Sequence, residues 1–267
     1  MENILLRDEA PLTAEQWRVV DATLSQVAGR VLVGRRILDL YGPLGFGAYT
    51  VPLYTYEKAE GEPVRAKIAR QLPMSTLTRE FVITVRDLEL MNDGQPFDAA
   101  PVAAAVTQIA LAEDRLLFHG NAAEGIEGLL NATGRQTLKL GDWDVEGQAL
   151  ADVSAATAHL ISEGFYAPYY VVLHPARMTK LQRVYGKRGI LEIELLEKQA
   201  TGGVFASPMM SQDQVLIVAA QAQHIDLAVG LDMAVGFIET ADLEHSFRIM
   251  ETLALRIKQP GAICTLE

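Results

Sequence analysis

The stretch EDRLLFHGNAAEGIEGLLN, residues 113–131, places two adjacent acids, a histidine and three glycines close together. Neighbouring helix residues point in different directions, so Glu113 and Asp114 would not converge on one ligand. His119 suits the C-terminal end of a helix, where partial positive charge is favourable. Gly120 then stands where a helix stops. We interpret the stretch as a helix end followed by a turning chain, with a metal or acid/base site as the alternative.

Helical spacing continues upstream of this stretch. Asp98 is a candidate cap, and an apolar stripe follows at Val102, Val106, Ile109, Leu116 and Leu117. This pattern predicts a long helix over about 98–119.

Two further helices are predicted. Thr13 and Gln16 fit a capping box before a helix over about 13–30. The second helix covers 147–163. Their apolar stripes are Trp17, Val20, Leu24, Val27 and Val31 in the first, and Leu150, Val153, Leu160 and Ile161 in the second.

Extended segments make up most of the remaining chain. Residues 49–85 form two arms about a polar turn, with Phe81, Ile83 and Val85 alternating against their neighbours. A hairpin this long is hard to bury within one subunit, and its edges invite pairing with a neighbour. Later strands are predicted at 169–175, 214–220, 226–238 and 247–259. The fold class is α+β.

Composition limits the partners. Twenty-three basic and thirty-four acidic residues give a net charge of −11, which disfavours nucleic acid and anionic lipid. No signal peptide or membrane span is visible, and the single cysteine, Cys264, suits a reducing compartment as a packing residue. We therefore expect a cytoplasmic protein that binds neither nucleic acid nor membrane.

Motifs for chemistry are weak. The five histidines lack metal-ligand spacing, and no Gly-x-Ser-x-Gly elbow is present. Residues 142–147 imitate half of a calcium loop, but Val153 occupies the position of the bidentate glutamate. The glycines of 34–47 precede a strand-like segment, unlike a phosphate-binding loop. We expect no enzyme activity, cofactor or metal, and keep a small hydrolase or protease as one alternative.

Several segments, taken in order, carry a family resemblance: EAPLTAEQW, GRRILDLYGPLGFG, LELMNDGQP, LAEDRLLFHGNAAEGIEGLLN, VGLDMAVGF and ETLALRIKQPGAICTLE. This ordered set resembles the encapsulins, bacterial shell proteins with the HK97 phage-capsid fold. The major capsid protein of a tailed phage or prophage, which shares that fold, is the first alternative, ahead of the hydrolase or protease.

The resemblance implies one HK97-like shell subunit over 1–267, with a peripheral domain, an axial domain and an extended loop. The N-terminal helix would be about 13–30, the extended loop about 49–78 and the spine helix about 98–119. The axial domain would be roughly 130–225, and strands 226–267 would return to the peripheral domain.

The resemblance also implies function. About sixty copies would close an icosahedral shell. The shell would enclose a cargo enzyme, a ferritin-like ferroxidase or a dye-decolorising peroxidase, held by a C-terminal targeting peptide.

By resemblance, cargo docks on the inner wall near Arg35, Ile37, Asp39, Met233 and Val235. Strand alternation would place the first three on one face. The alternative is that Arg35 and Asp39 merely pair with each other.

The loop lining the five-fold pore would comprise Tyr185, Gly186, Lys187, Arg188 and Gly189, with an ordinary surface turn as the alternative. Some encapsulins bind flavin against a tryptophan, but Arg86 stands at that position here. The resemblance therefore does not carry flavin over to this chain.

Overall fold

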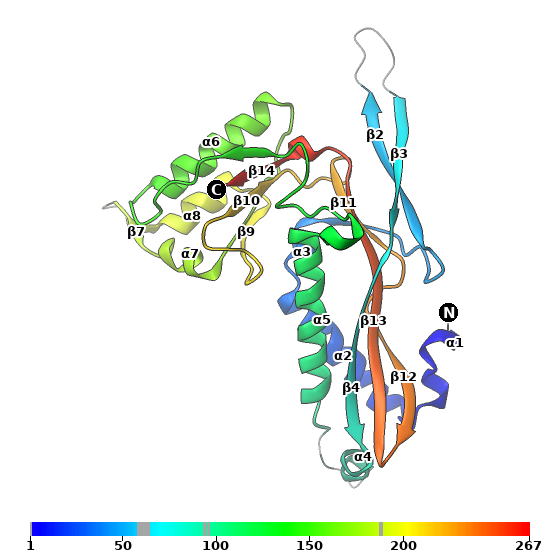
Figure 1. Cartoon of the computed structure of the whole chain (residues 1–267). Coiled ribbons are helices and arrows are strands. Elements are labelled where there is room, and N and C mark those ends of the chain that lie inside the picture. The colour runs from blue at the N-terminus through cyan, green and yellow to red at the C-terminus, as the bar shows by residue number, and fades with distance from the viewer. Residues whose placement is uncertain (1, 58–64, 93–94, 96, 187–188) are drawn as a thin grey trace.

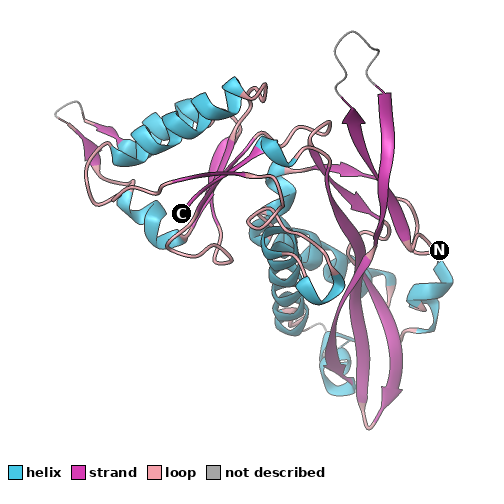
Figure 2. Cartoon of the chain, turned by 45° about the horizontal axis from the view of Figure 1, so that its top comes forward, coloured by secondary structure: helices cyan, strands magenta, loops and turns pink. Residues whose placement is uncertain are grey.

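The computed structural model describes residues 2–57, 65–92, 95, 97–186 and 189–267. Two five-stranded sheets lie at an angle to each other, and a two-stranded hairpin projects away from the place where they meet (Figure 1). The same arrangement, with helices beside both sheets, is visible after rotation (Figure 2). The predicted α+β class is confirmed.

The first sheet is built around its longest strand, β13. Its strand order is β1-β11-β13-β12, and β4 also pairs with β13. The strands are β1 (Asp39–Tyr41), β4 (Ser75–Thr84), β11 (Ile225–Val229), β12 (Ala234–Ala241) and β13 (Glu244–Ile257). The single strand predicted over 226–238 is therefore two strands, because the chain turns at Gly230, whose backbone N–H donates to Thr252 O.

Two helices cover this sheet and supply its core. They are α2 (Ala14–Val31) and α5 (Ala100–His119), and both predicted apolar stripes pack inward. The predicted capping box of α2 is present, because Thr13 N–H donates to Gln16 Oε1 and Gln16 N–H donates to Thr13 Oγ1. At the other helix, Asp98 accepts a hydrogen bond from Ala100 N–H. Local sequence thus fixes where α2 begins, whereas the N-cap of α5 is Ala99 and not the predicted Asp98.

The second sheet has the order β5-β14-β10-β6-β9. Its strands are β5 (Gln136–Leu138), β6 (Tyr170–Leu173), β9 (Gly203–Ala206), β10 (Val215–Val218) and β14 (Ile263–Leu266). The helices of this region are α6 (Gln148–Ser162), α7 (Pro175–Lys180) and α8 (Glu192–Gln199). In α6, Val153 and Leu160 are buried as predicted, whereas Ile161 is 48% exposed and does not belong to the stripe.

The last strand, β14, corrects the predicted course of the C-terminus. It pairs with β5 and β10, so residues 263–266 belong to the second sheet and do not return to the first. The strand β14 lies between β5 and β10, and all four of its residues are buried, as expected for a central strand.

The projecting hairpin consists of β2 (Thr50–Glu57) and β3 (Arg65–Pro73). Side chains along β3 are mostly exposed, and the buried residues Val51 and Leu53 lie in β2 near the base. The predicted second arm ends earlier than expected, because Val85 and Arg86 begin α4 (Val85–Asn92). Thr84 and Asp87 cap that helix: Asp87 N–H donates to Thr84 Oγ1, and Thr84 N–H donates to Asp87 Oδ2.

The stretch 113–131 ends α5 and folds the chain back along it. Leu129 N–H donates to Leu117 O, and Leu130 N–H donates to Phe118 O, both at 2.9 Å. Gly120 makes this return with φ 68° and ψ −164°, a region open essentially to glycine alone. A Cβ on Gly120 would lie 2.2 Å from Ile126 O. The short helix η2 (Ala122–Glu124) and Gly125 complete the turn.

Replacing Gly120 should therefore damage the fold far more than replacing Gly125. Gly125 also has φ 68°, but nothing lies within 4 Å of a Cβ there. We expect Gly125→Ala to lower the free energy of unfolding by about 1 kcal/mol, and Gly120→Ala by at least about 3 kcal/mol. Urea denaturation of the two variants measures both values. Equal losses would contradict the close packing assigned to Gly120.

Candidate functional site

The candidate site begins with a buried acid near the end of α5. Asp114 Oδ1 accepts from Gly34 N–H at 2.9 Å, and Asp114 Oδ2 accepts from Val33 N–H at 3.0 Å. Burial raises the pKa of Asp114 to about 6, while these two backbone donors oppose the rise. By binding successive backbone amides, the carboxylate fixes the start of a one-turn helix, α3 (Gly34–Ile37).

This turn corrects the predicted strand face. Arg35 and Ile37 lie in α3, and Asp39 lies in β1, so the three do not alternate along one strand. Ile37 is buried in the core cluster that extends into the second sheet, whereas Asp39 is exposed. The prediction failed because a carboxylate 80 positions away in the sequence curls the chain at Gly34.

Arg35 is the centre of an ion-pair cluster. Its Nε donates to Glu113 at 2.9 Å, its Nη1 to Asp232 at 2.6 Å and its Nη2 to Glu251 at 2.7 Å. Glu113 and Glu251 are fully buried. Arg35 thus pairs with these three acids. It does not pair with Asp39, and that pairing was the alternative left open by the sequence.

The cluster holds more acid than base. Burial disfavours the charge on Arg35, but hydrogen bonding and the charge of Glu113 outweigh it and raise the pKa of Arg35 above its usual value. Burial, followed by the charge of Glu113, raises the pKa of Glu251 well above the ordinary range. Glu251 Oε1 is buried without a hydrogen-bond partner among the described residues.

Metal binding has no support in this region. Within the described ranges, no group of three or more His, Cys, Asp or Glu side chains is arranged to hold a metal ion. His119 Nε2 contacts Met209 O at 2.7 Å, on the outer side of the α5 end. Glu113 and Asp114 point to different partners, so the opening stretch forms structural contacts rather than one ligand set.

An open groove lies beside the Arg35 cluster, between α2 and the turn that precedes β12. Its volume is about 360 Å³. Its lining residues are Leu24, Ser25, Ala28, Gly29, Leu32, Arg35, Arg36, Asp232 and Met233. Arg36 is exposed at the rim, where its Nη2 donates to Gly29 O and Arg30 O at 2.8 Å each. The groove therefore combines an apolar floor with charges of both signs at its edge.

The structure brings together only part of the predicted docking set. Arg35 and Met233 line the groove, whereas Ile37, Asp39 and Val235 do not. Val235 is fully buried within the first sheet. Arg36 and Asp232 also line the groove but were not among the predicted residues. Neither carries a local signal, because their place at the rim depends on the fold that joins residues nearly 200 positions apart.

The predicted pore loop lies in a small hairpin formed by β7 (Val184–Tyr185) and β8 (Ile190–Leu191). Lys187 and Arg188 lie outside the described residues. Gly186 and Gly189 have φ of 59° and 68°, which suits a tight turn. Gly186 N–H donates to Glu146 Oε1 at 2.5 Å, which anchors the hairpin to the acidic run.

The calcium-like run has protein partners instead. Asp144 pairs with Lys180 at 2.7 Å, and this hydrogen bond lowers the pKa of Asp144. Asp142 Oδ1 accepts from Asp144 N–H. Trp143 lies between these two acids in the sequence. Its side chain is buried, and its Nε1 donates to Asp152 at 2.8 Å. The run is a structured connection to α6.

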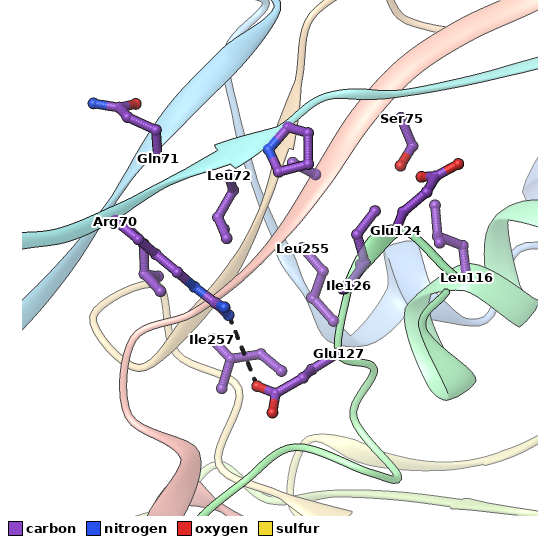
Figure 3. A pocket seen from close by; sticks show the side chains of 14 residues that line it. Arg70, Gln71, Leu72, Ser75, Leu116, Glu124, Ile126, Glu127, Leu255 and Ile257 are labelled. Atoms are coloured by element: carbon purple, nitrogen blue, oxygen red, sulfur yellow. Dashed lines mark ion pairs between the residues drawn. The ribbon is translucent and has the colours of Figure 1, made fainter. Parts of the chain in front are cut away.

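A cavity of about 230 Å³ lies at the base of the projecting hairpin (Figure 3). Leu72 and Ile126 point into it from the hairpin and from the loop after α5, and Arg70 and Glu127 form an ion pair across its mouth at 3.8 Å. Both charged side chains are at least a third exposed, so the pair contributes less than about 1 kcal/mol. We assign this cavity to the joint of the hairpin rather than to chemistry.

The two sheets, the spine helix α5 and the projecting hairpin define a capsid-type shell subunit, and known proteins give its family. The family model described as encapsulating protein for peroxidase matches residues 1–254. The type 1 encapsulin shell protein EncA of Myxococcus xanthus is 39% identical, with 100% of this chain and 97% of that protein covered. The diheme-cytochrome-encapsulin shell fusion protein of Kuenenia stuttgartiensis is 35% identical, with 98% and 75% covered.

A solved structure agrees in fold. The virus-like particle of Pyrococcus furiosus matches with a TM-score of 0.77 at 23% identity, over 93% of this chain and 98% of that chain. The chain belongs to the encapsulin shell-protein family and has the HK97 capsid fold. Its function is that of a shell subunit, which decides against the tailed-phage alternative. No helix in the described part of the chain is long and apolar enough to cross a membrane.

Removing Arg35 should destabilise the subunit strongly. Arg35→Ala leaves Glu113 and Glu251 buried without their cation, and we expect a loss of about 3–5 kcal/mol in the free energy of unfolding. Glu251→Gln keeps the size of the side chain and an oxygen that can accept from Arg35, so it should cost less than Arg35→Ala. Arg248→Ala, which breaks an exposed pair with Glu80, is the control.

Urea denaturation of the subunit and the yield of assembled particles are the two measurements. If Arg35→Ala lowers the free energy of unfolding by no more than Arg248→Ala does, the ion-pair cluster does not stabilise the subunit.

Proposed function

We propose that this chain alone closes an icosahedral shell of about sixty copies and holds a cargo enzyme inside it. The cargo would be retained by a short C-terminal targeting peptide seated in the groove between α2 and the Asp232–Met233 turn. The projecting hairpin supports the assembly, because it is a two-stranded sheet whose backbone edges can pair with a neighbouring subunit and whose β3 side chains are exposed along nearly their whole length.

The groove is the observation that carries the docking proposal. It is open, its floor is formed by Leu24, Ala28 and Met233, and its rim carries Arg36 and Asp232. Apolar pockets with a few charged groups at the edge bind short peptides specifically, since the floor supplies affinity and the rim fixes orientation. Arg35 supports the wall through its ion pairs, and Arg36 is the arginine at the rim.

The names of relatives support a redox enzyme as cargo. The matching family is described by a peroxidase, and the Kuenenia relative is fused to a diheme cytochrome. We propose that this shell encloses an enzyme of the same broad class, a ferritin-like ferroxidase or a dye-decolorising peroxidase.

Filling the groove should block cargo without harming the subunit. Gly29 lines the groove, and nothing lies within 4 Å of a Cβ placed there. Gly29→Leu should reduce loading of a peptide-tagged cargo by at least about tenfold, because the side chain occupies the peptide's volume. Gly29→Ala, the matched control, should load normally and gain roughly 0.5–1 kcal/mol in stability.

Loading is measured as the cargo-to-shell ratio in particles purified after co-expression with a fluorescent protein that carries the tail of the cargo encoded beside this chain. Normal loading of Gly29→Leu particles would place the docking site elsewhere.

We further propose that Lys187 and Arg188 line the five-fold pore. If five copies converge, about ten positive charges surround the opening and retard cations. In ferroxidase-loaded shells, replacing both residues by glutamate should speed ferrous iron uptake at low salt, and the gain should fade as salt screens the ring. Replacing the exposed Lys139 and Lys198 by glutamate changes the net charge equally and serves as the control. Identical uptake in both double variants would remove these residues from the permeation path.

The shell itself is proposed to be without enzyme activity or bound flavin, and to function in the cytoplasm. Burial raises the pKa of the Cys264 thiol to about 11, which makes it a poor nucleophile. Arg86 is exposed in a shallow pocket whose lining residues are Thr84, Val85, Arg86, Asp242, Leu243 and Glu244, and none of these is aromatic. A purified empty shell that hydrolyses casein or absorbs near 450 nm, as roughly expected of bound flavin, would contradict this part of the proposal.

A further inference from the structure

The N-terminal segment of the chain covers the surface next to the open groove. The N-terminal segment, residues 4–9, here called the strap, contains the end of α1 (Glu2–Leu5) and the short helix η1 (Arg7–Glu9). It lies along β12, the terminal strand of the first sheet. A Cβ on Gly236 of β12 would lie 3.1 Å from Leu5 Cα, so the backbone of the strap is pressed against the strand.

Arg7 fastens the strap. Its Nε donates to Val235 O at 3.0 Å, and its Nη1 donates to Asp21 Oδ2 at 3.2 Å. Its guanidinium carbon lies 4.0 Å from the centroid of the Trp17 ring, a cation–π contact. One side chain thus links the strap to α2 and to the edge of β12.

The strap and the open groove lie next to each other along α2 and the start of β12. Asp21 lies one turn before Leu24 in α2, and Val235 follows Met233 closely in the sequence. The open groove runs from Leu24 to Leu32, a rise of about 12 Å along the helix. That length accommodates roughly four residues of extended peptide. A longer docked segment that continues along α2 toward Asp21 would meet the strap.

Apart from the contacts made by Arg7, little holds the strap in place. Its helix α1 is a single turn, which is marginal without packing. Leu6 has φ 47°, a left-handed conformation that costs a non-glycine residue roughly 1–2 kcal/mol. Ile4 remains 41% exposed although it is apolar. These features describe a segment that another chain can replace.

We propose that the strap covers the surface onto which the cargo groove would extend toward Asp21, and that an incoming cargo segment displaces it. The displacing segment must bring an apolar side chain for the position of Leu5 and a basic side chain for the position of Arg7. The basic group is required because Asp21 and the Trp17 ring lose their cation when the strap leaves. This inference rests on the proposed docking of cargo in the groove.

The test uses the strap's own chemistry as the probe. A fluorescent protein ending in NILLRDE, the sequence of residues 3–9, is co-expressed with the full-length shell chain. In wild-type shells the tethered strap outcompetes the probe through its high effective concentration. Arg7→Ala loosens the strap, and these shells should trap about tenfold more probe. Arg18→Ala, which breaks an exposed pair with Glu15, should load as wild type does.

Two further variants separate occupancy of the groove from simple loosening. Adding Asp21→Ala to Arg7→Ala should return loading to the wild-type value, because the groove then lacks its anion. Gly236→Ala should loosen the strap, because the added Cβ would lie 3.0 Å from Leu5 O, and faster protease cleavage within residues 4–9 would report this. The same Cβ fills the seat of the probe, so loading should not rise.

Particle formation, read by electron microscopy in the same preparations, reports on the proposed function separately. Absence of shells from the wild-type chain would overturn the shell proposal. Shells that form but trap equal probe with and without Arg7 would overturn the strap proposal alone. Failure of Arg7→Ala to assemble while wild type does would also overturn it, because a displaceable strap must be dispensable for assembly.

Discussion

The guanidinium of Arg35, buried against Glu113, Glu251 and Asp232, is the interaction on which the rest of the subunit depends. It joins α3, the end of α5, the middle of β13 and the turn before β12, four places that are distant in the sequence. Arg35 and its fully buried partners Glu113 and Glu251 tolerate little displacement, because separating them leaves a buried group without its partner. Such a cluster specifies one arrangement even where apolar packing would permit several.

The groove follows from this cluster. Arg35 and Asp232 form part of its wall while they pair with each other, so the position of the turn before β12 sets its width. Asp114 adds a second constraint by holding the amides of Val33 and Gly34, which places Arg36 at the rim. The acids near the end of α5 therefore shape the groove in which we propose that cargo docks. They are structural residues whose effect reaches the surface through α3.

Local patterns in the sequence predicted the three longest helices, α2, α5 and α6, and the hairpin, because capping and apolar periodicity act over a few residues. The capping box at Thr13 and the stop at Gly120 are examples. The failures share a different cause. Residues 35–39 do not alternate along a strand, because Asp114 binds the backbone at Gly34 and starts a helical turn there. Residues 263–266 belong to the second sheet, because they pair with both β10 and β5. For the groove, the resemblance supplied Arg35 and Met233, whereas Arg36 and Asp232 required the three-dimensional structure, since no short-range pattern relates them.

The central claim is that the chain closes a shell by itself with α2 and its groove on the inner wall. A single-particle reconstruction of the recombinant chain, expressed without any cargo, tests this most directly. The account predicts a closed icosahedral particle of about sixty copies. In it, each projecting hairpin lies on a neighbouring subunit, and α2 faces the lumen. A stable monomer or dimer, an open tube, or a shell with α2 on its outer surface would contradict the account.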